Sequence, residues 1–470
     1  ELERYKLADS EAEFWQKTAK YRQFASENEG GLIEYLKRVM LQSSAITSPQ
    51  DVAWFLASYA RDAKSRLDSH ADLPVLTNIR TALENALGVK FTGAKGDRFF
   101  RSTLVQTLFY GIFSAWVLWH KTIISSPHPP TPSPTGEGEK FRLQFFDWKT
   151  SAYYLHVPMI QALFEQIARP SKLRELNLVE VLDWTGSALN RVNRNEFFNK
   201  FDEGQAVQYF YEPFLEAFDP QLRKELGVWY TPPEIVKYMV ERVDMVLREE
   251  LEIEDGLADE NVYILDPCCG TGAYLVEVLK KIAQILEEKG EGALTISQVK
   301  EAAKNRVFGF EILTAPFVIA HLQLGLVLQN LGVPLQEENE RLGVYLTNAL
   351  TGWQPPDEEG KKKLQQLEMN FPELNKEKEA ADEIKRGKPI LVVLGNPPYN
   401  AYAGTSPTEE EGLVDVYKEG LINEWGIKKF NLDDLYTRFL RLAERAISEN
   451  TKKGVVCYIS NFSCFSTISI

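Results

Sequence analysis

The stretch Asn261–Ile282, NVYILDPCCGTGAYLVEVLKKI, decides the fold class of this 470-residue chain. It begins with a short apolar run that predicts a buried strand, passes through a glycine-rich turn, and continues with the apolar spacing of a helix. Gly270 and Gly272 lie in the turn, where positive φ or a close approach of a ligand to the backbone favours glycine. A strand, a glycine turn and a helix in this order indicate a nucleotide-binding unit, although many kinds of loop share the pattern.

Four more apolar runs of strand length follow, and amphipathic helical segments separate them. The runs are RVFGFEI (306–312), RLGVYLTNAL (341–350), PILVVLGNPPY (389–399) and GVVCYISNF (454–462). Alternation of strands and helices predicts a doubly wound, parallel α/β sheet. Such sheets bind ligands at the carboxyl ends of their strands, so we expect the functional residues there.

The part before residue 220 has a helical pattern instead. Val52, Phe55 and Leu56 follow the start signal Ser48-Pro49 at helical spacing. We predict a helical domain over residues 1–220 and a catalytic domain over 221–470. A proline-rich stretch at 125–140 reads as a flexible surface insertion rather than a ligand for a partner domain. The aromatic residues between 145 and 154 favour a core over a base-stacking platform.

Composition excludes several classes of protein. Four cysteines are too few for a disulfide scaffold, which indicates a cytoplasmic location, and neither they nor the five histidines suggest a metal site. No apolar run reaches the roughly 18–20 residues of a membrane span, so no membrane partner is expected. The net charge of −14 argues against a nucleic-acid binder, unless a basic cleft lies within an acidic total.

The charged segment between the third and fourth predicted strands, residues 356–388, contains Glu383-Ile384-Lys385. A metal-dependent nuclease would need such a triplet on a strand, with an aspartate on a neighbouring strand. The surrounding residues are rich in lysine and glutamate and have a helical pattern. We therefore interpret the triplet as part of a solvated helix face.

The glycine turn favours a nucleoside cofactor without phosphates. The G-x-G-x-x-G spacing that binds a pyrophosphate is absent. Asp266 ends the first strand, where its carboxylate can meet a positive charge or a hydroxyl group. Glu311 ends the second strand, where it can bind a ribose diol. S-adenosyl-L-methionine is the common cofactor of this kind, and the alternative is a structural turn with an unrelated glutamate.

The fourth strand ends in Asn396-Pro397-Pro398-Tyr399. An amine conjugated to an aromatic ring is a poor nucleophile because its lone pair is delocalised. The Asn396 side-chain carbonyl and the Pro397 main-chain carbonyl can each accept one N–H of such an amine. The prolines restrict the backbone that carries these acceptors, and Tyr399 offers a face on which a base can stack.

These motifs resemble those of methyltransferases that act on amines. DPCCGTG (266–272) with NPPY (396–399) is similar to the amino-methyltransferases that use S-adenosylmethionine, which have a Rossmann-like fold. The segments at 227–243, 311–328 and 345–350 resemble adenine-N6 DNA methyltransferases of the large single-chain restriction-modification type. This resemblance implies double-stranded DNA with a flipped adenine as substrate. It also implies further cofactor-binding residues: Tyr230, Thr231, Pro232, Thr271 and Asn348.

The resemblance implies seven strands and then a target recognition domain, whereas the sequence stops soon after the fifth predicted strand. We therefore expect a sheet that is truncated after the fifth strand, with nuclease or target-recognition parts in the full-length protein. Two alternatives stay open. One is an amino-methyltransferase that acts on RNA or protein glutamine, and the other is an inactive remnant that only binds cofactor.

Overall fold

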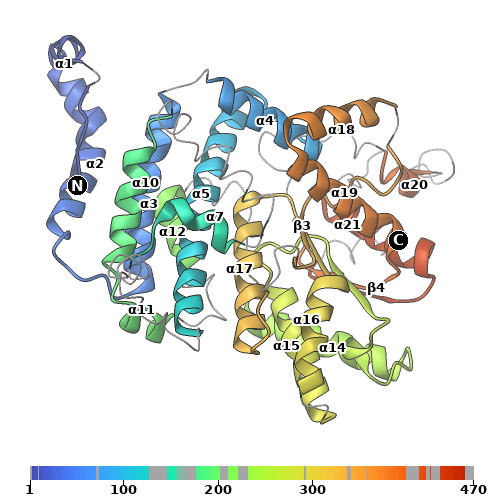
Figure 1. Ribbon diagram of the computed structural model, residues 1–470. Helices are drawn as coiled ribbons and strands as arrows, with labels where there is room; N and C mark the ends of the chain where they lie inside the picture. The colour runs from blue at the N-terminus through green and yellow to red at the C-terminus, as the bar shows by residue number, and fades with distance from the viewer. Residues whose placement is uncertain are drawn as a thin grey trace. The chain divides into compact units, whose positions relative to one another are not determined.

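Figure 1 shows the computed structural model of the chain. The structure describes residues 3–8, 10–69, 73–125, 145–155, 157, 161, 176–201, 210–220, 231–290, 293–335, 340–356, 358–398, 412–419, 424 and 435–460. The predicted proline-rich insertion lies outside the described residues, except for Ser125, and so do Tyr230 and Tyr399.

The chain divides into two compact units that each consist of several segments. The first comprises residues 1–71, 119–151 and 168–220, and the second comprises 72–118, 152–167 and 221–470. The sequence predicted one boundary near residue 220, but the N-terminal helices are shared between the units. Helix α5, Gly93–Ser125, belongs to both units, because it begins in the second unit and continues into the first.

The described part of the first unit is helical, as predicted. Its elements are α1 (Glu11–Thr18), α2 (Tyr21–Met40), α3 (Pro49–Asp68), η1 (Trp148–Thr150), α10 (Val179–Asn190), α11 (Arg194–Lys200) and α12 (Glu212–Phe218), and the short α7 (Ser151–Tyr154) starts at its boundary. Helix α3 begins at the predicted signal, since the Ser48 side chain accepts a hydrogen bond of 3.1 Å from Asp51 N. Helices α10 and α12 pack against α3, whose apolar face is buried.

The aromatic segment at 145–154 is only partly core. Phe146 and Trp148 are buried, whereas Phe145 is 50% exposed and Tyr153 is 77% exposed. Helix α5 is the one described helix that is long and apolar enough to cross a membrane, and 89% of its apolar window is buried within the protein. The sequence predicts no apolar stretch of that length, whereas α5 has one; its burial is that of a core helix.

The second unit contains the sheet and its covering helices. Before the first strand come α4 (Pro74–Leu87), α14 (Pro233–Glu249) and η4 (Gly256–Ala258). The strands are β1 (Tyr263–Asp266), β2 (Val307–Glu311), β3 (Val344–Leu346), β4 (Ile390–Gly395) and β5 (Val455–Tyr458). The helices between them are α15 (Ala273–Glu288), α16 (Ala293–Asn305), α17 (Thr314–Asn330), α18 (Glu358–Asn370), α19 (Pro372–Gly387), α20 (Asp415–Lys418), α21 (Leu435–Glu444) and the π-helical η6 (Arg445–Thr451).

All five predicted strands are present and their pairings are parallel, in the order β3-β2-β1-β4-β5. The register pairs Asp266 with Gly309, Glu311 with Leu346, and Gly395 with Tyr458. The carboxyl ends of the strands therefore lie along one edge. In the described part of the chain, β5 pairs with β4 alone, and Val456 on it is 43% exposed.

Helices cover both faces of the sheet (Figure 1). Helices α15, α16 and α17 pack on one face, with α14 against α15, while α19, α21 and η6 pack on the other. The core of the second face joins Leu265, Phe310 and Val393 of the strands to Ile384 of α19 and Leu442 of α21. Burial on both faces explains why the central strands read as continuous apolar runs.

Helix α19 corrects the interpretation of Glu383-Ile384-Lys385. The segment is helical, as predicted, and Glu383 is exposed, but Ile384 is 4% exposed and Lys385 is 1% exposed. Both lie on a face that packs on β3, together with Ala381. The charged composition concealed this buried face, because three of its members, Glu377, Asp382 and Lys385, are themselves charged.

Candidate functional site

Polar residues follow four adjacent strands at the carboxyl edge of the sheet. Asp266 ends β1 and Glu311 ends β2, while Asn348 follows β3 and Asn396 follows β4. Three of these residues are less than 9% exposed, and Asn396 is half-buried. The topology thus gathers residues that are up to 130 positions apart in the sequence (396 minus 266) into one region.

The glycine turn after β1 is held close to its neighbours. Gly270 has φ of 54° and Gly272 has φ of 88°, which agrees with the predicted need for glycine. Cys269 N donates to Phe310 O of β2 at 3.0 Å, and the Gln323 side chain of α17 donates to Thr271 O at 2.5 Å. The turn is therefore fixed in place before the first residues of α15.

Glu311 is buried and accepts main-chain hydrogen bonds. One carboxylate oxygen accepts from Ile312 N at 2.9 Å and from Leu313 N at 2.7 Å. Burial raises the pKa of Glu311 to about 7, against the lowering effect of these bonds and of one from Gly270. A ligand that donates hydrogen bonds to Glu311 would stabilise its charged form.

Asp266 is fully buried at the end of β1. One carboxylate oxygen, Oδ1, accepts from Cys268 N at 3.1 Å, whereas Oδ2 has no hydrogen-bond partner among the described residues. Burial, together with a smaller effect of the nearby Glu311 charge, raises the pKa of Asp266 to about 7. An oxygen without a partner at this depth is costly, which fits a position that a polar or cationic ligand completes.

Gly395 allows β4 to approach this carboxylate. A Cβ atom at Gly395 would lie 2.7 Å from Asp266 Oδ1 and 3.2 Å from Cys268 Sγ. Any other residue would therefore displace the end of β1 or the turn that follows it. The glycine before Asn396 is explained by this close approach.

Asn348 lies in the turn after β3. Its side-chain oxygen accepts from Leu350 N at 3.0 Å, and its main-chain oxygen accepts from Lys385 Nζ at 3.0 Å. Thr347 N donates to Glu311 O at 2.8 Å. The turn that carries Asn348 is thus tied to the end of β2 and to α19.

Asn396 contacts the segment before the first strand. Its side-chain nitrogen Nδ2 donates to Thr231 Oγ1 at 3.2 Å. Thr231 is 8% exposed and also lies beside the Tyr274 hydroxyl of α15, which in turn donates to Met239 Sδ at 3.2 Å. The structure therefore brings together two predicted site residues that are 165 positions apart. Pro232, directly after Thr231, is exposed.

Three residues of this region were not predicted from the sequence: Gln323, Gly395 and Tyr274. Only Gly395 had a signal, because a glycine at the end of an apolar strand marks a close backbone approach. Gln323 and Tyr274 lie within helical patterns, where one polar position does not show which neighbour it meets.

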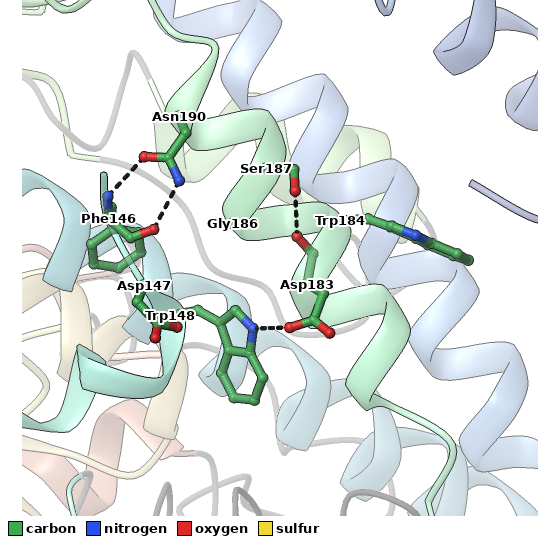
Figure 2. Close-up of a pocket in the computed structure, with 8 residues that line it drawn as sticks. All are labelled: Phe146, Asp147, Trp148, Asp183, Trp184, Gly186, Ser187 and Asn190. Carbon is green, nitrogen blue, oxygen red and sulfur yellow. Dashed lines mark hydrogen bonds between the residues drawn. The ribbon is translucent and has the colours of Figure 1, made fainter. Parts of the chain in front are cut away.

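The first unit contains a separate cavity of about 320 Å³, shown in Figure 2. Its polar groups bond to one another: Trp148 Nε1 donates to Asp183, the Asn190 side chain bonds both N and O of Phe146, and the Ser187 hydroxyl donates to Asp183 O. None of the predicted site residues lines it. These bonds explain the polar residues as structural, so the carboxyl edge of the sheet is the better candidate site.

The strand order, the glycine turn after β1 and the acidic residue that ends β2 define the α/β fold of the S-adenosylmethionine-dependent methyltransferases. The sequence profile of the N-6 DNA methylase family matches residues 203–461, more than half of the chain. The chain belongs to this family.

The chain is also similar to proteins of restriction-modification systems. It is 25% identical over 259 residues to a protein of Methanocaldococcus jannaschii named as a type II restriction enzyme and methyltransferase, covering 44% of this chain and 22% of that protein. It is 24% identical over 197 residues to the type I restriction enzyme EcoEI methylase subunit of Escherichia coli, covering 41% of this chain and 35% of that subunit. The alignments thus span about a third or less of each relative.

Two solved structures share the fold. The DrdV–DNA complex gives a TM-score of 0.53 at 20% identity, over 92% of this chain and 36% of that chain. The second structure is a nuclease-deletion mutant of the type ISP restriction-modification enzyme LlaGI in complex with a DNA substrate mimic. It gives a TM-score of 0.54 at 17% identity, over 93% of this chain and 31% of that chain. Both similarities concern the architecture.

Proposed function

We propose that this chain transfers a methyl group from S-adenosyl-L-methionine to N6 of adenine in double-stranded DNA. The observation that carries the proposal is the hydrogen bond between Asn396 and Thr231, at the edge where Asp266 and Glu311 are buried. It supports the proposal because it joins Asn396 of the proposed amine-binding motif to Thr231 of the predicted cofactor segment. Membership of the N-6 DNA methylase family supports DNA as the substrate.

Asn396 would use its side-chain carbonyl oxygen to bind an incoming amine. Its nitrogen Nδ2 donates to Thr231 Oγ1, so Oδ1 is the atom proposed to accept from a target –NH₂ group. The main-chain carbonyl of Pro397 is the second acceptor, and the two prolines restrict its direction. Two acceptors on one amine nitrogen draw it out of conjugation and direct its lone pair towards the methyl donor.

S-adenosylmethionine, when bound, supplies the methyl group on a positively charged sulfur. Glu311 would accept hydrogen bonds from the ribose hydroxyls, and Asp266 would use its Oδ2 oxygen, for which the described residues supply no partner. An added Cβ at Gly270 would meet open space, so the ligand could approach the turn there, whereas Gly272 packs against Ala320 of α17. The remaining residues in the proposed cofactor site are Tyr230, Thr231, Pro232, Thr271 and Asn348.

The adenine must leave the double helix to reach this edge, since its N6 is otherwise buried in the base pair. Tyr399, which follows the two prolines in the sequence, is proposed to stack on the flipped base. The relatives are named as parts of restriction-modification enzymes, and we extend that role to this chain, with nuclease or target-recognition parts in the complete enzyme.

Methyl transfer with an isotopically labelled cofactor tests the proposal. The protein is incubated with S-adenosylmethionine that has a deuterated methyl group and with double-stranded DNA, RNA or a glutamine-containing peptide in separate reactions. We expect labelled N6-methyladenine from DNA alone, detected by mass spectrometry of the digested nucleosides, and none with Asn396→Ala. Label in RNA or in the peptide would favour the other amino-methyltransferases. Cofactor binding without transfer to any substrate would favour an inactive remnant.

A further inference from the structure

Helix α19 carries a lysine whose ammonium group is fully buried. The Lys385 side chain is 0% exposed, and Nζ donates to Thr347 Oγ1 at 2.8 Å, to Asn348 O at 3.0 Å and to Asp382 Oδ1 at 3.2 Å. It also lies over the Phe310 ring of β2, 5.2 Å from the centroid. Three hydrogen bonds satisfy all three donors of the ammonium group.

Neutralising Asp382 does not require this lysine. Lys378, one helical turn earlier, already pairs with the other carboxylate oxygen of Asp382 at 3.0 Å. Burying an ammonium group is costly, and an apolar side chain of similar volume would serve the core at least as well. What Lys385 adds is a pair of hydrogen bonds to the turn after β3.

Helix α19 holds the same turn at two further points. A Cβ atom at Gly352 would collide with Asp382, so the helix packs directly on the main chain there. Glu377 accepts from Leu346 N at 2.9 Å, at the end of β3, and pairs with Arg341 at 2.9 Å. The turn 347–352 is therefore clamped to α19 along its length.

This turn lies at the carboxyl edge of the sheet, where the cofactor is proposed to bind. Leu346 pairs with Glu311 in the sheet, and Thr347 N donates to Glu311 O. Asn348 lies within the turn. The position of Glu311 and Asn348 relative to one another thus depends on the residues that Lys385 contacts.

We propose that Lys385 is a positioning residue of the cofactor site, whose ammonium group fixes the turn 347–352 against the end of β2. The inference rests on the proposed function, because it assigns Lys385 a role in the affinity for S-adenosylmethionine and its product. Under this proposal, helix α19 between β3 and β4 supports the active site and is not only a solvated insert.

Substitution of two lysines on one helix tests this role. Lys385→Met removes the ammonium group at similar length, while Lys378→Met removes the other lysine that pairs with Asp382 and leaves the turn untouched. Calorimetric titration with S-adenosylhomocysteine should show about tenfold or greater loss of affinity for Lys385→Met, since the two lost bonds to the turn both have a charged donor. Lys378→Met should bind like the wild type.

The stoichiometry separates positioning from folding. A positioning role predicts one site per chain at weaker affinity, and a higher KM for the cofactor with kcat unchanged within about twofold, because Asn396 lies on another strand. A purely structural role would reduce the fraction of competent protein and leave the affinity of that fraction unchanged, which would overturn the inference. If Lys385→Met does not fold, Thr347→Val replaces it, because it deletes one partner of the ammonium group and keeps the pair with Asp382.

The two proposals fail in different ways. A wild-type protein that does not bind S-adenosylhomocysteine contradicts the proposed function. A wild-type protein that binds it, with Lys385→Met or Thr347→Val equal to Lys378→Met in affinity, contradicts the role of Lys385 alone.

Discussion

Glu311→Gln should stabilise the protein without cofactor, although it removes a residue proposed to bind that cofactor. The wild-type carboxylate is buried, and burial raises its pKa from 4.5 to about 7. The folded state therefore favours the protonated form, and at pH 8 it must hold a charge that the unfolded chain exposes to water. Glutamine has the same size, carries no charge, and can still accept from Ile312 N and Leu313 N.

The magnitude follows from proton linkage. Between pH 4.5 and 7 the folded protein binds more protons at Glu311 than the unfolded chain does, so stability falls as pH rises, by about 1.4 kcal/mol per pH unit. From pH 5.5 to pH 8 the free energy of unfolding of the wild type should fall by about 2 kcal/mol through Glu311. The variant lacks this titrating group and should not show that fall. Loss of the Glu311 charge also lowers the pKa of Asp266, which adds to the stabilisation at high pH.

Urea unfolding followed by circular dichroism at pH 5.5 and pH 8 measures this effect. We expect Glu311→Gln to gain stability over the wild type at pH 8 and to lose most of that gain at pH 5.5. Glu377→Gln is the matched control, because it removes a buried carboxylate that Arg341 pairs at 2.9 Å and should destabilise the protein by about 3 kcal/mol. A Glu311→Gln protein that is less stable than the wild type at pH 8 would refute the reasoning.

Asn396→Ala should abolish methyl transfer to DNA in a radiolabel assay while cofactor affinity stays within a few-fold, and transfer near the wild-type rate would remove Asn396 from the mechanism. Thr231→Val deletes the hydroxyl that accepts from Asn396, so kcat should fall about fivefold; equal kcat would show that the contact does not orient the amide. Gly395→Ala places a methyl group 2.7 Å from Asp266 Oδ1 and should lower the free energy of unfolding by about 1–3 kcal/mol, and an unchanged melting temperature would contradict this packing. Val456→Lys, on the 43% exposed position of β5, should increase the soluble yield, whereas equal yields would mean that this strand does not drive aggregation.

The sheet could be predicted from the sequence because its signals are local. Central strands that are buried on both faces read as apolar runs, and each run ends in a polar or glycine residue that marks the carboxyl edge. The sequence alone therefore predicts that Asp266, Glu311 and Asn396 lie at one edge of the sheet. The sign of φ at Gly270 and Gly272 was predictable for the same reason, since it depends on the turn itself.

The remaining features depend on contacts between distant segments. Lys385 is one of many charges in a lysine- and glutamate-rich helix, and nothing in that pattern shows that its ammonium group meets the turn after β3. The exposure of Phe145 and Tyr153 likewise depends on tertiary neighbours that a local pattern does not show. Residues 72–118 group with the sheet unit because of tertiary packing, which a helical period alone does not reveal.

The central claim is that the carboxyl edge of the sheet binds S-adenosylmethionine, and calorimetric titration tests it most directly. The wild type should bind one cofactor per chain. Glu311→Ala should bind at least about tenfold more weakly, since it loses charge-assisted hydrogen bonds to the ribose. Absence of binding by the wild type, or an unchanged affinity in Glu311→Ala, would contradict the account.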